Sequence, residues 1–227
     1  MQPSPMHYFP VTPLFMLLLG LVLVVVIALV EIKVITYAYE KMGIHHRYVF
    51  AILLLSLLGS GVNIPIAELP GKDMVVHKVV DFFGVEYVVP TVEHEGRTVL
   101  AINLGGAVIP LLLSIYLLVE HRLYVKGALA IAVVAAVTHW FATPVRGLGI
   151  AISPLIAPVV AALAALVISR QRAAPLAYIA GSVGTLLGAD VFNLYRIQEL
   201  GAPVASIGGA GVADGIFLAG IVAVLLA

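Results

Sequence analysis

The sequence predicts an all-α membrane protein of about seven transmembrane helices, with a short extramembrane β-hairpin between the second and third. Hydrophobic residues make up 62% of the chain and charged residues only 11%. Several separate apolar runs reach about twenty residues, the length at which a helix crosses a bilayer. Because these runs occupy most of the 227 residues, we expect a single polytopic membrane domain, residues 1–227, without a soluble catalytic module.

Charge and cysteine content narrow the function classes further. The 12 basic residues balance the 12 acidic ones, so nothing indicates nucleic acid as a partner, and the expected partner is the lipid bilayer. The absence of cysteine excludes disulfides, thiolate nucleophiles and cysteine-held metal or iron–sulfur sites. No cofactor is indicated. The first dozen residues lack the basic region of a signal peptide, so we expect the first span to be retained.

The predicted spans are numbered one to seven in chain order. They cover residues 13–30, 48–69, 100–119, 125–143, 150–168, 173–194 and 204–227. Span 2 carries Gly59, Gly61 and Pro65 in its second half, which weaken a helix, and broken helix at membrane depth needs protein or water around it. Spans 2 and 5 are therefore either full crossings or re-entrant segments.

Residues 71–100 form the one sizeable extramembrane segment. Apolar and polar residues alternate there and many are β-branched, which favours a β-hairpin with its turn at His94, Glu95 and Gly96. One interpretation is a solvated hairpin. The other is a lid, or an edge strand that pairs with an extended peptide.

The basic residues predict the orientation, because cytoplasmic loops are enriched in Lys and Arg. The first, third and fifth connections carry seven: Lys33, Lys41, Arg47, Arg122, Lys126, Arg170 and Arg172. The even connections carry five: Lys72, Lys78, Arg97, Arg146 and Arg196. We therefore expect a multi-pass cell-membrane protein with its N-terminus outside and its C-terminus inside.

Two carboxylates in the last two spans are the anomaly in this apolar chain. An ionisable group within a span is costly and indicates a functional site, and we predict that Asp190 and Asp214 form a pair. The helical rise places Asp190 about 6 Å and Asp214 about 15 Å below the outer surface. Unwinding of the glycine-rich run Gly208, Gly209, Ala210 and Gly211 would bring the two together. Alternatively, Asp190 is an interface carboxylate paired with Arg196 or capped by Asn193.

Other embedded polar residues fall in the same outer half of the predicted bundle. Asn63, Asn103 and His139 join Asp190 there, and together they predict a polar cavity open to the outer face and lined by spans 2, 3, 4, 6 and 7. Each has a structural alternative: the two asparagines serve as hydrogen-bonding groups between helices, and His139 serves as an interface or core histidine. Gly181, Gly184 and Gly188 form a small-residue ridge whose usual role is close helix packing.

Four motifs carry a resemblance to a known family. GTLLGADVFNL, APVASIGGAGVADGIFLAGIVAVLLA, INLGGAVIP and THWFATPVRGLGI together resemble an uncharacterised family of archaeal and bacterial integral membrane proteins, a domain of unknown function. The resemblance runs from about Val62 to the C-terminus and implies no particular reaction.

A second resemblance does imply one. One aspartate in each of two consecutive helices, the second after a glycine-rich turn, is similar to the presenilin and signal-peptide-peptidase class of intramembrane aspartyl proteases. This implies catalytic roles for Asp190 and Asp214 on a membrane-embedded peptide. The chain departs from that class in having Ala189 and Ala213 before the two aspartates, and it lacks the Pro-Ala-Leu motif.

Three chemistries remain open for these carboxylates. Carboxyl groups about 3 Å apart share one proton, so that one acts as general base on water while the other polarises a peptide carbonyl. Interrupted helices with embedded carboxylates also suit an ion- or proton-coupled transporter or channel. Metal binding by His139, Asp190 and Asp214 lacks any tight ligand spacing, so no metal site is predicted. A non-catalytic membrane scaffold is the third hypothesis for the function, after the protease and the transporter or channel.

Overall fold

The structure, a computed structural model, describes residues 13–70, 74–82, 85–93, 97–145, 149–199, 204–209 and 215–227. Its chain divides into two compact units, residues 1–37 and 38–227. The first unit contains most of helix α1 (Pro13–Lys41), which covers the predicted first span, residues 13–30, and continues beyond it. Gly43 follows this helix with φ +88, and its N–H donates to the Glu40 carbonyl. That backbone conformation favours glycine, as expected for a residue that ends a helix.

The second unit begins with the end of α1 and helix α2 (His46–Ser60), followed by strand β1 (Asn63–Pro70). The prediction of a helix over 48–69 is therefore wrong for its second half. Gly59, Gly61 and Pro65 weaken the helix there, and the extended segment gains backbone hydrogen bonds from β4, a strand about thirty residues away in sequence. Residues Glu31–Lys41 and His46–Ser60 together are apolar enough for one broken span or a re-entrant loop.

The predicted β-hairpin is present, but its turn lies elsewhere. Strands β2 (Met74–Phe82) and β3 (Val85–Glu93) are antiparallel, with Met74 opposite Glu93 and Phe82 opposite Val85. The chain therefore reverses between Phe82 and Val85, ten residues before the predicted turn. Residues 94–96, where the turn was predicted, connect β3 to β4 and lie outside the described residues.

The middle of the chain is a strand followed by helices. Strand β4 (Arg97–Asn103) leads directly into the π-helical turn η1 (Leu104–Val108) and helix α3 (Ile109–Glu120), so the predicted third span begins as a strand. Helix α4 (Tyr124–Phe141) confirms a helix over most of the predicted fourth span, residues 125–143. Strands β5 (Thr143–Val145) and β6 (Gly149–Ala151) pair antiparallel before helix α5 (Ile156–Ile168), which is shorter than the predicted fifth span.

The C-terminal part holds the longest described helix of the second unit. It runs through η2 (Arg170–Arg172), α6 (Ala173–Ile179), the π-helical segments η3 (Ala180–Gly184) and η4 (Leu186–Asp190), and the 3-10 segment η5 (Val191–Glu199). Strand β7 (Val204–Ile207) and helix α7 (Gly215–Leu226) follow. The prediction of a helix over 204–227 is wrong for residues 204–207, which are extended and pair with β4.

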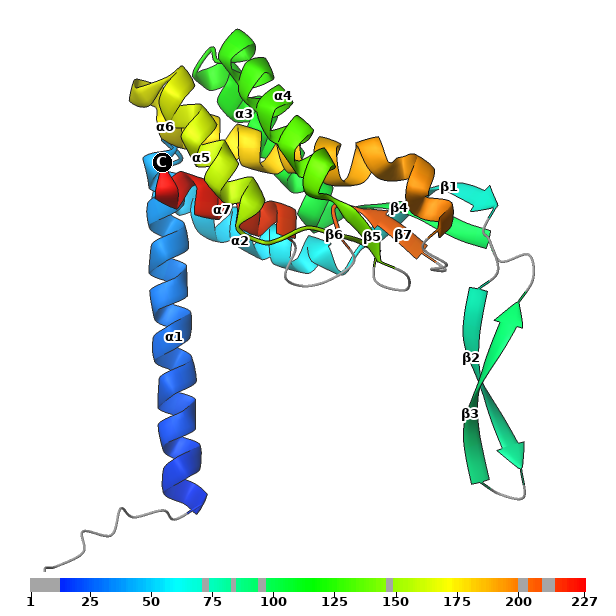
Figure 1. The fold of residues 1–227 in the computed structure, drawn as a ribbon. Coiled ribbons are helices and arrows are strands. Elements are labelled where there is room, and N and C mark those ends of the chain that lie inside the picture. The colour runs from blue at the N-terminus through cyan, green and yellow to red at the C-terminus, as the bar shows by residue number, and fades with distance from the viewer. Residues whose placement is uncertain are drawn as a thin grey trace, which may run out of the picture. The chain divides into compact units, whose positions relative to one another are not determined.

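Three strands from distant parts of the chain form one small sheet in the order β1-β4-β7 (Figure 1). Strand β1 is antiparallel to β4, and β7 is parallel to β4. Each strand adjoins a helix end: β1 follows α2, β4 precedes η1, and β7 comes shortly before α7. The sheet therefore gathers three points at which predicted helical spans are interrupted.

The predicted glycine ridge packs helices closely, as expected. A Cβ on Gly181 would meet Gly220 of α7, and one on Gly184 would lie 2.7 Å from Val134 of α4. A Cβ on Gly188 would overlap Thr138 Oγ1 and the Ala135 carbonyl, also on α4. Because real Cβ atoms do not approach so closely, glycine is required for these helices to touch.

Within the described residues, two helices are long and apolar enough to cross a membrane, Tyr124–Phe141 and Arg170–Arg196, and the bent pair would make a third. Leu104–Glu120 and Ile156–Ile168 are shorter apolar helices. The protein is thus mostly helical, with a small sheet, and two or three of the described helical segments have the length and apolar composition of membrane spans. The count of seven helical spans stays a prediction.

Candidate functional site

The candidate site is built where Asp190 ends the π-helical segment η4. The carboxylate Oδ2 of Asp190 accepts a hydrogen bond from the Gly208 N–H at 2.7 Å. Gly208 follows directly after β7 and has φ +89, a conformation that glycine adopts without strain. The bond therefore joins the long C-terminal helix, at the point where η4 changes to the 3-10 segment η5, to the glycine-rich segment that leads toward α7.

Gly208 itself is fixed by close packing on the start of η1. A Cβ at this position would lie 2.6 Å from Ala107 Cβ and 2.7 Å from Ala107 N. No other residue type fits such an approach. The backbone after β4 thus holds the backbone after β7 in place, and Gly208 in turn presents its N–H to Asp190.

Two predicted cavity residues meet beside this point. Asn63, the first residue of β1, lies opposite Asn103, the last residue of β4. The Asn103 amide nitrogen donates to Asn63 Oδ1 at 3.0 Å and to the Ser60 carbonyl at 2.7 Å, and its Oδ1 accepts from the Gly106 N–H at 2.8 Å. Asn103 is buried, and it caps the first turn of η1.

Ser206 of β7 completes this network and was not singled out in the sequence. Its hydroxyl donates to Asn63 Oδ1 at 2.6 Å. The sequence VASI contains nothing that distinguishes this serine from a serine on an ordinary strand or helix. Only the parallel pairing of β7 with β4, which places Ser206 opposite Ala101, brings it near Asn63.

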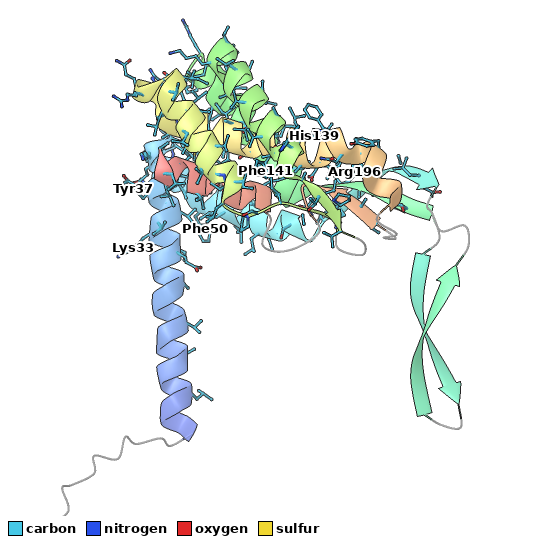
Figure 2. All side chains as sticks on the ribbon, viewed as in Figure 1. Lys33, Tyr37, Phe50, His139, Phe141 and Arg196 are labelled. Atoms are coloured by element: carbon cyan, nitrogen blue, oxygen red, sulfur yellow. The ribbon has the colours of Figure 1, made fainter. Side chains whose placement is uncertain are left out.

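The structure places Asn193 and His139 apart from these hydrogen bonds. The buried Asn193 amide donates to the carbonyl oxygens of Gly188 and Ala189 at 2.9 and 3.0 Å. The Asn193 side chain thus supplies hydrogen-bond donors to backbone carbonyl oxygens where η4 changes to η5. His139 lies near the end of α4 (Figure 2). Its ring is edge-on to the Phe192 ring, with centroids 6.0 Å apart.

Some predicted site residues lie outside the described residues. Asp214 and Gly211 are among them, so the predicted contact between the two aspartates stays a prediction, while Gly209 is described and has φ +86. Residues 204–209 are extended or turned rather than helical, which agrees with the predicted unwinding near Gly208. Across the described ranges, no group of three or more His, Asp or Glu side chains is placed to hold a metal ion.

Fold and site together define a class: an α-helical, membrane-associated protein whose interrupted helices meet at a short sheet beside a carboxylate. A family model described as "Protein of unknown function (DUF1614)" matches residues 57–226, and the chain belongs to this family. The predicted resemblance to an uncharacterised family is thereby confirmed. Comparison with the curated proteins and with the solved structures gives no match.

Proposed function

We propose that this chain is a multi-pass membrane protein that hydrolyses a peptide bond of a membrane-embedded substrate, with Asp190 and Asp214 as its catalytic pair. The observation that carries the proposal is the hydrogen bond from Gly208 to the Asp190 carboxylate. Asp214 follows six residues after Gly208 and directly precedes α7. The segment that bears the second aspartate is therefore tied to the first, and a short chain of this kind spans at most about 20 Å.

The same hydrogen bond supports a division of roles. An N–H that donates to a carboxylate stabilises its ionised form, so Asp190 is the group that stays ionised and acts as general base. It takes a proton from water as the water oxygen attacks the peptide carbonyl carbon. Asp214, protonated, donates to the carbonyl oxygen to give a gem-diol. As the C–N bond then breaks, the proton held by Asp190 passes to the departing amine nitrogen, and Asp214 takes back a proton from one gem-diol hydroxyl, which restores the pair.

The sheet supports a way of presenting the substrate. Among the described strands, β7 pairs with β4 alone and forms one edge of the sheet. An extended peptide that added to this edge would run beside Gly208 and hence toward Asp190, and strand addition exposes a peptide bond that a helix keeps internal. The β2–β3 hairpin remains the other candidate for this role.

A reporter with a single membrane span tests the proposal. We expect Asp190→Asn, Asp214→Asn and the double variant to lose cleavage to the same low level, because residues that act as a unit are not additive. Glu120→Gln, which changes a carboxylate at the end of α3 outside the site, should cleave like the wild type. Retained cleavage in either single variant, with the thermal melting point unchanged, rejects the pair.

A second function, ion- or proton-coupled transport, is favoured by a different observation. Helical segments are interrupted by strands after Ser60, before Leu104 and before Gly215, and a carboxylate lies at this junction. Secondary transporters build ion sites from such discontinuous helices. Proteoliposomes loaded with a pH-sensitive dye should then show proton flux that Asp190→Asn abolishes, with no cleavage product. A non-catalytic scaffold would show neither activity.

A further inference from the structure

A pocket lined by basic residues lies in the second unit, formed by segments other than those of the Asp190 site. It has a volume of about 320 Å³. Its walls are residues 40–43 at the end of α1, His121 after α3, residues 170–175 at the start of the long C-terminal helix, and Ala227. In Figure 1 the start of that helix lies at the opposite end of the second unit from β1, β4 and β7.

The pocket is lined by three Lys or Arg side chains and by a single acidic side chain, Glu40. The cations are Lys41, Arg170 and Arg172. Lys41 Nζ donates to the Val224 carbonyl at 3.2 Å, which anchors it against the last turn of α7. The guanidinium groups of Arg170 and Arg172 are exposed, so both are open to an incoming anion.

His121 holds one of these guanidinium groups in a fixed position. Arg172 Nη1 lies 2.5 Å from His121 Nδ1, and His121 Nε2 lies 2.9 Å from the Met42 carbonyl oxygen. A guanidinium only donates, so Nδ1 accepts and Nε2 carries the proton that it donates to Met42. Arg172 keeps its remaining N–H groups for another acceptor. The hydrogen bond to His121 thus positions the Arg172 side chain, unlike basic side chains at a membrane surface that have no such partner.

We propose that this pocket binds a phosphate group, carried by an anionic phospholipid or by a soluble phosphate. Guanidinium groups match phosphate oxygens with paired hydrogen bonds, and a fixed guanidinium loses less entropy on binding. The three connections that contribute Lys41, His121 and Arg170–Arg172 are the odd-numbered ones, whose basic residues the sequence assigns to the cytoplasmic side. Basic pockets between helices on that side bind anionic lipid headgroups. The proposal does not depend on the reaction proposed for Asp190.

The test uses the full-length protein in phosphatidylcholine nanodiscs. Short-chain phosphatidic acid is titrated in one arm and inorganic phosphate in the other, and binding is followed by native mass spectrometry and by the melting temperature. We expect Arg170→Gln with Arg172→Gln to weaken binding about 30-fold, because each basic residue near an anionic headgroup contributes roughly fivefold. Arg170→Lys with Arg172→Lys, which keeps the charge, should lose less.

Arg196→Gln is the matched control, since Arg196 is a basic residue on η5 that does not line the pocket. It should bind like the wild type. Saturable binding of phosphatidic acid alone identifies the lipid, and equal binding of inorganic phosphate identifies a soluble ligand. Binding of neither probe, or equal binding by the wild type and the Gln double variant, overturns the proposal.

Discussion

Replacing Asn103 with alanine should be among the most destabilising polar substitutions in the sheet. Asn103 is buried, and its amide serves two backbone groups, the Ser60 carbonyl and the Gly106 N–H. Asn63 keeps the Ser206 hydroxyl as a donor. Each buried backbone group left without a partner costs about 1–3 kcal/mol. The free energy of unfolding should therefore fall by about 3 kcal/mol, which corresponds to a melting temperature roughly 10 °C lower for a chain of this size.

Thermal unfolding in mild detergent measures this effect, with two variants for comparison. Asn103→Asp keeps an acceptor for the Gly106 N–H but loses both donors, so it should destabilise at least as much as alanine. Ser114→Ala removes a buried hydroxyl that only donates within its own helix, to the Pro110 carbonyl at 2.7 Å, and should cost less than about 1 kcal/mol. If the melting temperatures of Asn103→Ala and Ser114→Ala differ by only a few degrees, the hydrogen bonds of Asn103 do not stabilise the junction between the end of α2 and the start of η1.

Three further substitutions test the close contacts around Asp190. Gly188→Ala would force its Cβ into Thr138 Oγ1, so α4 and the long C-terminal helix should separate and the melting temperature should fall; a wild-type melting curve would contradict the packing. Gly208→Ala combines a positive φ with overlap on Ala107, and it should abolish whichever activity depends on Asp190 while leaving the β2–β3 hairpin intact in amide exchange. Asn193→Ala leaves two backbone carbonyl oxygens without their side-chain donor and should cost about 1–3 kcal/mol in thermal unfolding, whereas a neutral result would show that other groups satisfy them.

The apolar runs of the sequence predicted where the long helices lie but not where they stop. Span 4 became α4, and span 6 became the long helix over Arg170–Arg196. Pro175 of span 6 lies near the start of that helix, where proline is tolerated, and its glycines lie where the helix packs against α4 and α7. The segments that became β1 and β7 also contain apolar β-branched residues, and Ile64 or Val204 suits a strand as well as a helix. Hydropathy measures the free energy of transferring a side chain from water to apolar surroundings, so it does not distinguish a strand from a helix.

The strands could not be predicted from local sequence because their partners are distant. β7 is stabilised by parallel pairing with β4, in which Val204 lies opposite Val99, about one hundred residues earlier in the chain. The signals that were present were breakers, Gly61 and Pro65 for β1 and Gly208 for β7. They indicated an interruption without indicating what replaces the helix.

The charged and amide residues of the site and Gly208 were predicted from the sequence, whereas Ser206 and the roles of the backbone N–H groups were missed. Asp190, Asn63 and Asn103 were conspicuous because polar groups are rare in these runs. Ser206 and the backbone N–H groups of Gly106 and Gly208 were not, since a backbone donor has no sequence signature. Their roles depend on which amides the fold leaves outside a helix or a ladder.

The interruptions of the helices explain how the Asp190 carboxylate obtains a backbone hydrogen-bond donor. Inside a continuous helix every backbone N–H donates to the preceding turn, so a carboxylate among such helices would find no free backbone donor. Here the N–H that meets Asp190 belongs to Gly208, just past the end of β7, and the N–H that meets Asn103 belongs to the first turn of η1. At these breaks backbone N–H groups donate to side chains, whereas in an unbroken helix they would donate to backbone carbonyl oxygens. Restoring helix through residues 204–209 would therefore remove the Gly208 donor from Asp190, and any function that depends on this hydrogen bond would be weakened with it.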